Sequence, residues 1–176
     1  MANRDALREL QSRLAERLKV ARTQGVAPSW LAVEADGKKY LFPMGQAGEI
    51  FPWVPTQAVP YTQNWFLGVA NLRGGLFGVV DLASYVSGQR PLPKTEQARK
   101  ESRLVAFNGA FEVNSALLID RLAGLRNQEA FDDFAHSAAD APDFFGNRYI
   151  DKTGASWQEI NLQSLALETR FLSIAA

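Results

Sequence analysis

The sequence predicts a mainly β protein built from two related halves. The first observation is a set of two-residue turns, Asp36-Gly37, Gly74-Gly75 and Asn108-Gly109, each flanked by short apolar runs as in β-hairpins. The second is that residues 79–84 (VVDLAS) are paralleled by residues 159–164 (EINLQS), where a strand leads into a helix-capping Asp or Asn. The 176 residues suffice for one sizeable domain or for two small barrels sharing a core, and these short parallels leave both arrangements open.

Composition excludes several classes of protein. The 19 Lys and Arg balance 19 Asp and Glu, so the net charge does not indicate binding to nucleic acid or to an anionic membrane. With no cysteine, the chain has no disulfide, no catalytic thiol and no Cys-ligated zinc. No apolar run approaches the roughly 20 residues of a membrane span, and the charged N-terminus is unlike a secretory signal peptide. We therefore expect a cytoplasmic protein with no direct membrane insertion.

Residues 4–22 have the spacing of an amphipathic helix, with leucines three or four positions apart between positions 7 and 18. We expect residues 1–26 to form a helical extension and residues 27–176 to form the folded domain. The leucine stripe is narrow, which favours a solvated helix lying on the domain. A helix that docks a separate partner is the alternative.

The folded part begins with a predicted hairpin in which residues 31–34 and 39–42 flank Asp36-Gly37. Residues 52–66 are rich in proline and aromatic side chains, so we expect an extended connector there. Its PWVP run matches the PxxP pattern of SH3 ligands. The apolar side chains within that run favour burial against the domain instead.

A second hairpin is predicted over residues 66–82, with Gly74-Gly75 supplying the positive φ angles of the turn. Arg73 lies beside this turn. If the first strand alternates, its apolar side chains face one way, while Asn71 and Arg73 share the opposite face. A charged side chain held beside a rigid turn is suited to recognising a partner.

The segment of residues 127–145 is expected to be an acidic surface loop, because it carries five acidic side chains and no Lys or Arg. The other expected elements are a helix over residues 82–86 capped by Asp81, a surface loop over residues 90–103, strands over residues 104–107, 111–113 and 115–122, and a final helix capped by Asn161 that ends near Ser173.

Two groups of side chains have chemistry suited to catalysis or metal binding. Asp81 and Asp120 are candidates for the carboxylate pair that glycosidase-like hydrolysis requires, but nothing in the sequence places them together, and capping or a local hydrogen bond accounts for each. His136 lies four positions from both Asp132 and Asp140, but no second histidine supports a metal site. Nucleophile-elbow and phosphate-binding glycine motifs are absent from the sequence. We expect no catalytic residue, cofactor or metal and favour a binding module; a hydrolase using Asp81 and Asp120 is the alternative.

Residues 68–74 (GVANLRG) and 79–82 (VVDL) resemble the CheW family of chemotaxis adaptors. Residues 116–122 (ALLIDRL) are similar to the family's G-L-L-V-D-x-V strand, and the resemblance covers roughly residues 29–172. It is weakest over residues 127–148. Within the family, the central strand and the N-terminal helix are most similar to PilI-type adaptors of pilus-linked chemosensory systems.

This resemblance implies two SH3-like, five-stranded β-barrel subdomains that share a core, with an N-terminal helix and a short C-terminal helix. It also implies a noncatalytic adaptor that couples the cytoplasmic tip of a chemoreceptor, a methyl-accepting protein, to the regulatory domain of a CheA-type histidine kinase. The adaptor would act in twitching motility driven by type IV pili and reach membrane receptor arrays through its partners. A general chemotaxis adaptor for flagellar motility is the alternative.

The resemblance places Arg73 on the receptor-facing surface and Glu49 and Ile50 near the same region, and Asn71 shares the predicted face of Arg73. The chain departs from the family pattern at Gly78, where proline is usual, and at residue 116, where alanine replaces glycine. Because glycine regains a backbone N–H donor, we expect the strand edge at Gly78 to pair differently or to bend.

Overall fold

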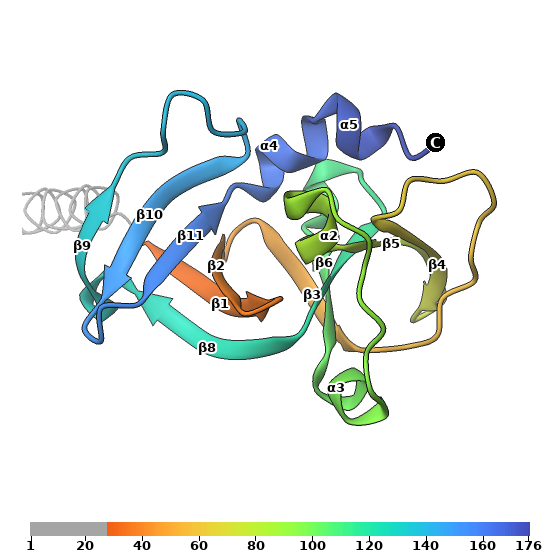
Figure 1. Cartoon of the computed structure of the whole chain (residues 1–176), viewed down its shortest axis with the longest axis horizontal. Coiled ribbons are helices and arrows are strands. Elements are labelled where there is room, and N and C mark those ends of the chain that lie inside the picture. The colour runs from red at the N-terminus through yellow and green to blue at the C-terminus, as the bar shows by residue number, and fades with distance from the viewer. Residues whose placement is uncertain (1–27) are drawn as a thin grey trace, which may run out of the picture.

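A computed structural model describes residues 28–176, which form two β-sheets lying side by side, with short helices at their junction (Figure 1). The strands are β1 (Ser29–Ala35), β2 (Lys38–Pro43), β3 (Ala47–Pro52), β4 (Phe66–Leu72), β5 (Gly75–Asp81), β6 (Arg103–Phe107), β7 (Ser115–Ile119), β8 (Arg121–Asn127), β9 (Phe131–Ala135), β10 (Phe145–Asp151) and β11 (Ser156–Ile160). The helices are α2 (Leu82–Ser87), α3 (Glu96–Glu101), α4 (Leu162–Leu167) and α5 (Thr169–Leu172), with 3-10 turns η1 (Gly109–Phe111) and η2 (Gln128–Ala130). The expected helix over residues 4–22 and the extension of residues 1–26 lie outside the described residues.

The two sheets confirm a mainly β fold with two related subdomains. The six-stranded sheet has the order β8-β1-β2-β11-β10-β9, and the five-stranded sheet has the order β3-β6-β7-β5-β4. Each contains one parallel pair, β2 with β11 and β5 with β7, between antiparallel neighbours. Strands β8, β1, β2, β11 and β10 therefore occupy the same places in one sheet as β3, β6, β7, β5 and β4 in the other.

The related halves are interleaved in the fold. The hairpin β1–β2 pairs with the late hairpin β10–β11, whereas β4–β5 pairs with β6–β7 from the middle of the chain. Strand β3 crosses to the edge of the five-stranded sheet and β8 crosses to the edge of the six-stranded sheet. Each subdomain consequently needs segments from both halves of the sequence. In each sheet the two edge strands are not hydrogen-bonded to each other, so the two barrels are curled but not closed.

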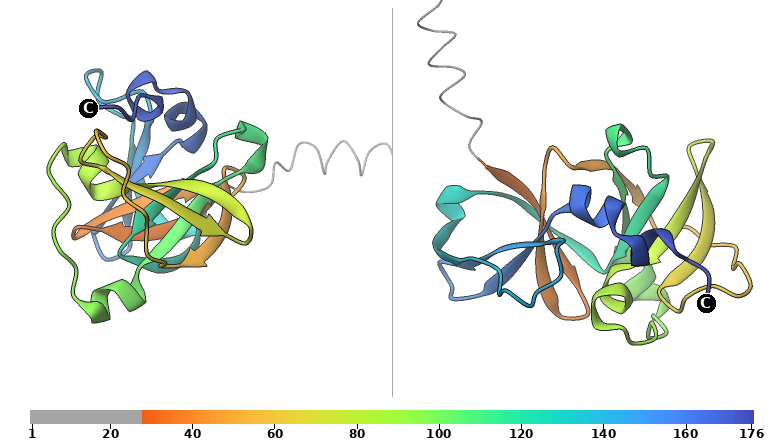
Figure 2. Two further views of the ribbon diagram at one scale, coloured as in Figure 1. Left: turned by 90° about the vertical axis from the view of Figure 1, so that its right-hand side faces the viewer. Right: turned by 90° about the horizontal axis from the view of Figure 1, so that it is seen from above.

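One hydrophobic core joins the two subdomains. It contains Val33 and Phe42 from the six-stranded sheet and Val80 and Leu117 from the five-stranded sheet, all of them buried. Helices α4 and α5 lie across the junction (Figure 2), and Phe171 of α5 contributes to the same core. Two smaller clusters fill the individual barrels. Because the largest cluster is shared, neither barrel has a complete core of its own, as expected for subdomains of this size.

The two helix caps lie where the sequence predicts them. The side chain of Asp81 accepts the backbone N–H of Ser84 at the start of α2, and Asn161 accepts that of Ser164 at the start of α4. The expected final helix is not continuous, because Glu168 has an extended conformation and separates α4 from α5. The break coincides with a 2.7 Å hydrogen bond from the Tyr85 hydroxyl to the Glu168 carboxylate.

Two expectations for the middle of the chain are wrong in detail. Residues 111–113 do not form a strand, because the chain makes the 3-10 turn η1 after Asn108 and extends again only at Ser115. The surface loop over residues 90–103 contains α3, whose first turn is capped by the Thr95 hydroxyl. Local polar side chains stabilise both turns.

The acidic segment of residues 127–145 also differs from the expected loop. It contains η2 and β9, which adds a sixth strand beside β10 and makes this subdomain larger than five strands. Phe131 and Phe134 anchor β9 through ring contacts with Tyr149, at centroid distances of 5.2 and 6.1 Å. Cross-strand aromatic packing thus outweighs the polar composition of the segment. None of the helices in residues 28–176 is long and apolar enough to cross a membrane.

Candidate functional site

The tip of the β4–β5 hairpin presents Arg73 to solvent. Its turn is Arg73-Gly74, with φ angles of 50° and 83°, and Leu72 pairs with Gly75. The expected turn at Gly74-Gly75 is therefore one residue too far along the chain. Two consecutive positive φ angles match the right-handed twist of a hairpin. The side-chain Oδ1 atom of Asn71 accepts the Gly74 N–H at 2.9 Å, which stabilises this register.

Arg73 forms an ion pair with Glu49 of β3, and its guanidinium lies 6.0 Å from the centre of the Phe51 ring. The side chains of Arg73 and Glu49 are 77% and 44% exposed, respectively. Strands β3 and β4 are opposite edges of the five-stranded sheet, so this contact joins the two edges of a strongly curled sheet. An exposed ion pair contributes little to stability, and both partners remain accessible to another protein.

We call the exposed side chains of Glu49, Asn71, Arg73 and Leu76 the hairpin surface. Leu76 is 64% exposed and lies directly opposite Asn71 in the hairpin, so the two side chains share a face. The sequence-based candidates did not include Leu76. Its place next to the turn, before the buried residues of β5, is the feature that could have indicated an exposed side chain. The surface combines charged, amide and apolar groups.

Ile50 does not join the hairpin surface. It lies opposite Val105 of β6, which packs in the shared core, whereas its neighbour Phe51 packs inside the five-stranded barrel. Ile50 therefore lies on the other face of β3, where it is 36% exposed. Of the four expected residues, the structure pairs Arg73 with Glu49 and places Asn71 in the same turn as Arg73, on the face of β4 opposite the buried Leu72.

Two glycines allow close packing around the hairpin. Gly68 has φ of 121°, and a Cβ there would lie 2.1 Å from the carbonyl oxygen of Gln57. Gly78 donates its N–H to the carbonyl oxygen of Asn114 at 2.9 Å, in the parallel pairing of β5 with β7. A proline at position 78 would lose that donor. At Gly78 the strand therefore makes a backbone hydrogen bond to Asn114, the residue before β7.

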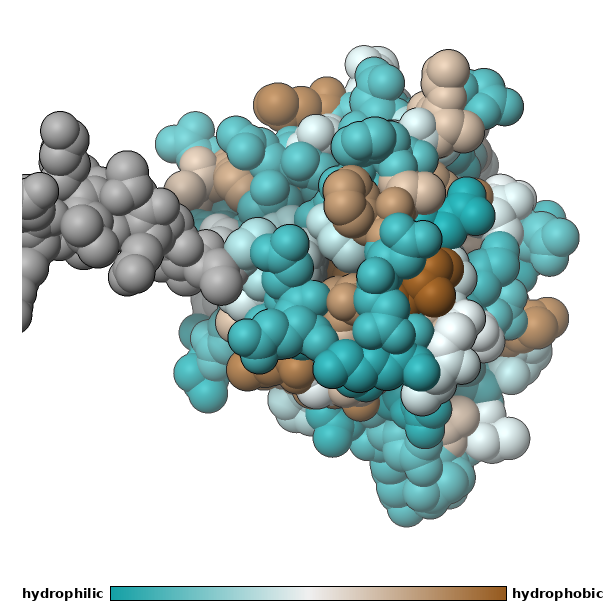
Figure 3. Space-filling view, turned by 90° about the vertical axis from the view of Figure 1, so that its left-hand side faces the viewer, coloured by the Kyte–Doolittle hydropathy of each residue, from teal (hydrophilic) through white to brown (hydrophobic). Residues whose placement is uncertain are grey.

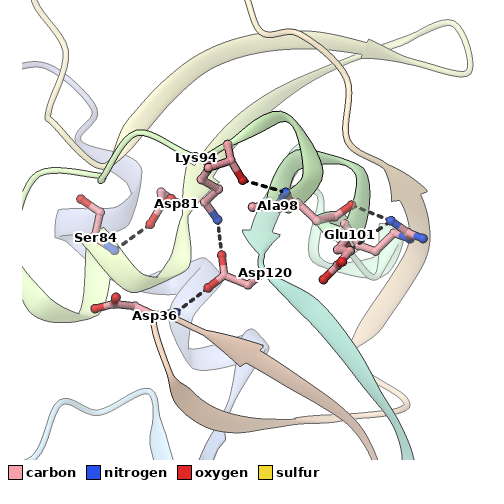
Figure 4. A network of polar contacts seen from close by, with 10 residues as sticks. Asp36, Asp81, Ser84, Lys94, Ala98, Glu101 and Asp120 are labelled. Carbon is pink, nitrogen blue, oxygen red and sulfur yellow. Dashed lines mark hydrogen bonds and ion pairs between the residues drawn. The ribbon is translucent and has the colours of Figure 1, made fainter.

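A second group of polar residues lies in a cleft of about 410 Å³ lined by Asp36, Asp81, Lys94 and Asp120 (Figure 4). No sequence pattern indicates that Asp81 and Asp120 share a cleft. The Asp120 carboxylate accepts the backbone N–H of Asp36 at 2.7 Å and forms an ion pair with Lys94. These bonds join the β1–β2 turn, the segment before α3 and the β7–β8 junction, so Asp120 has a clear structural role.

Asp81 is buried and caps α2 through the N–H of Ser84. Burial raises the pKa of the Asp81 carboxyl, because the charged form loses hydration; the cap and Lys94 oppose this increase. The folded state therefore gains stability from Asp81 below the ordinary pKa of 3.8 and loses it as the pH rises through the folded-state pKa.

Asp81→Asn is expected to retain the stability of the wild type at pH 7 and to flatten its dependence on pH, because asparagine caps helices about as well as aspartate without a buried charge. Asp81→Ala is expected to lose about 1 kcal/mol through loss of the cap. Urea unfolding of the three proteins between pH 4 and pH 8 measures both effects. Equal losses at pH 7 in the two variants would contradict the assigned capping role.

The proposed ligand pattern around His136 does not form on a helix. Asp132 lies in β9, while His136 follows that strand and contacts Asn147 through its Nδ1 atom at 3.0 Å. Within residues 28–176 no group of three or more His, Asp or Glu side chains is arranged to hold a metal ion.

The hairpin surface is accessible and combines charged, polar and apolar groups. The acidic side chains of the cleft cap a helix or join separate elements. These features are those of a β domain suited to recognising other proteins. The chain belongs to the family with a CheW-like domain, whose family model matches residues 29–166. It is therefore a CheW-like scaffold domain of the chemotaxis signalling type.

Similarity to individual proteins agrees with this family. The chain is 27% identical over 107 residues to Protein PilI of Pseudomonas aeruginosa, across 59% of this chain and 56% of that protein. It is 40% identical over 47 residues to a probable chemotaxis protein CheW of Rhizobium etli, across 27% of this chain and 30% of that protein. The matches thus span about half or less of the length of these relatives.

The fold also matches a solved structure, that of the scaffolding protein TtCheW from Thermoanaerobacter tengcongensis. The TM-score is 0.64 at 16% identity, and the match covers 85% of this chain and 98% of that chain. The likeness extends across both subdomains at this low identity, so it supports the fold.

Proposed function

We propose that this protein is a noncatalytic adaptor that couples a chemoreceptor to a CheA-type histidine kinase in a pilus-linked chemosensory system. The observation that carries the proposal is the exposed Arg73 at the tip of a rigid hairpin in a CheW-like fold. A guanidinium can make bidentate, charge-assisted hydrogen bonds to carboxylates of a receptor helix. Glu49, Asn71 and Leu76 complete a surface with ionic, polar and apolar groups, whereas Ile50 lies apart from it on the other face of β3.

The cleft that contains Asp81 and Asp120 gives little support to the alternative that the protein is a hydrolase. The carboxylate oxygens there accept hydrogen bonds from backbone N–H groups or pair with Lys94. A general acid and a nucleophile must instead be free to contact a substrate. The adaptor function therefore accounts better for these residues.

Similarity to PilI favours the pilus system over flagellar chemotaxis, whereas the shorter match to a probable CheW protein keeps the flagellar role as the second candidate. Deleting the gene in its host should abolish twitching and leave swimming intact under the first hypothesis. Loss of swimming alone would support the second.

Co-purification tests the adaptor function directly. The full chain, mixed with a tagged cytoplasmic receptor fragment and an untagged kinase from the same organism, is expected to bring the kinase into the receptor complex. Omitting the chain should reduce the recovered kinase at least about tenfold, which corresponds to about 1.4 kcal/mol of coupling. Kinase recovery that is unchanged when the chain is omitted would contradict the proposal.

A further inference from the structure

The six-stranded subdomain contains a concave cationic site, which we call the basic cup. It has a volume of about 320 Å³ and is lined by Lys39 of β2, Arg126 of β8 and Lys152 of the β10–β11 turn. The buried Trp157 ring lies between these elements, with the Lys39 ammonium and the Arg126 guanidinium 5.1 and 5.4 Å from its centre. The aromatic ring thereby helps to position two of the cations.

The two carboxylates that line the basic cup accept hydrogen bonds from donors other than its three cations. Glu34 accepts hydrogen bonds from Arg121, each 2.7 Å long. The Asp151 carboxylate accepts hydrogen bonds from Thr153, from the N–H of Ala155 and from the Trp157 indole N–H. In the part of the chain that the structure describes, the three cations of the cup form no ion pair with a carboxylate. The cup therefore retains positive charge although the whole chain is neutral.

The surroundings of the cup favour the binding of a small anionic group over the binding of a flat anionic membrane. Ala130 lines the cup; Glu129 precedes it in the chain, and the exposed Asp132 and Asp133 follow it. A recessed positive site leaves room for one or two carboxylates, and the acidic side chains of the adjoining segment repel a flat anionic membrane. Figure 3 shows this end of the molecule, where hydrophilic side chains predominate and apolar groups occur in separate small areas.

We propose that the basic cup docks an acidic polypeptide segment of a second partner, with Asp or Glu carboxylates contacting Lys39, Arg126 and Lys152. The cup is lined by residues of the six-stranded subdomain. The hairpin β4–β5 that carries Arg73 lies in the five-stranded subdomain, at the other end of the molecule from β9 and β10 (Figure 1). Two partners can thus occupy the chain at once. In naming a second partner this inference rests on the proposed adaptor function; the affinity of the cup for carboxylates does not.

The test measures the fluorescence anisotropy of a fluorescein-labelled ten-residue peptide of alternating Gly and Glu, titrated with the full chain at low salt. Lys39→Gln/Lys152→Gln is expected to bind at least about fivefold more weakly than the wild type, because two charge-assisted contacts are lost. Lys152→Glu alone should produce a similar loss of affinity. It changes an exposed turn residue and leaves both cations over the Trp157 ring in place. Lys100→Gln on α3 is the matched control and should bind as the wild type does.

Equal affinity of all four proteins would overturn the proposal, as would equal affinity for a peptide in which Gln replaces Glu. Binding to phosphatidylserine vesicles without binding to the Glu peptide would also overturn it and indicate a membrane surface. The assay contains neither receptor nor kinase. A failed co-purification therefore leaves the peptide result intact, and a failed peptide titration leaves the adaptor function intact.

Discussion

Arg73→Glu is expected to weaken association with the receptor fragment at least about tenfold, or about 1.4 kcal/mol, while the protein remains folded. The new carboxylate would face Glu49, and both would repel an acidic receptor helix in place of the attraction that Arg73 provides. Stability should change by no more than about 0.5 kcal/mol, because the side chain is largely exposed. Isothermal titration calorimetry measures the affinity, and thermal unfolding measures the stability.

Two further variants separate a contact with the receptor from a role within the protein. Lys100→Glu introduces the same charge change at another exposed site of the five-stranded subdomain and should leave the affinity unchanged. Arg73→Glu/Glu49→Arg restores an internal ion pair of opposite polarity. If Arg73 contacts the receptor, this charge swap leaves the affinity low; full recovery would show that the pair matters only for the hairpin.

Asp151→Ala is expected to lower the free energy of unfolding by about 3 kcal/mol, which corresponds to a fall in Tm of roughly 6–12 °C for a domain of this size. The Asp151 carboxylate accepts the Trp157 indole N–H at 2.8 Å and the N–H groups of Thr153 and Ala155 in the β10–β11 turn. Removing it leaves the indole N–H of a fully buried tryptophan without an acceptor. Circular dichroism during heating measures the change.

The same hydrogen bonds hold the pKa of Asp151 well below its usual range, with those from Thr153 and Trp157 having the largest effects. This stabilisation is present above the ordinary pKa of 3.8 and is lost as the pH falls through the folded-state value. The difference in Tm between wild type and Asp151→Ala should therefore narrow in strong acid. Asp133→Ala on exposed β9 is the matched control, and a fall in its Tm as large as that of Asp151→Ala would contradict this role.

Short-range signals predicted much of the local structure correctly. The hairpin at Asp36-Gly37 and the caps at Asp81 and Asn161 depend on residues within three positions of one another, so their sequence patterns suffice. The turn at Arg73-Gly74 was misplaced by one residue because Arg, which seldom adopts a positive φ, occupies a position where the hydrogen bond from Gly74 to Asn71 stabilises that conformation. Predicting the register of this turn therefore requires knowledge of the hydrogen bond between Gly74 and the Asn71 side chain.

Contacts between residues far apart in the chain decided the features that local sequence patterns and composition did not predict. Strand β9 forms because Phe131 and Phe134 pack on Tyr149 of β10, although the segment reads as an acidic loop. Asp81 and Asp120 share a cleft because α2 and the β7–β8 junction meet there. The basic cup unites Lys39 with Lys152, more than a hundred positions later in the chain.

The sequence by itself determined the mainly β class, the two sets of related elements, the helix caps and the resemblance that led to Arg73. Only the tertiary structure decided how those elements combine: the halves interleave, Arg73 meets Glu49 across the edges of a curled sheet, and the cations of the cup surround Trp157. The physical reason is the range of the interactions. Turns and caps satisfy backbone groups within a few residues, whereas the shared core can be buried only when both halves contribute strands to both sheets.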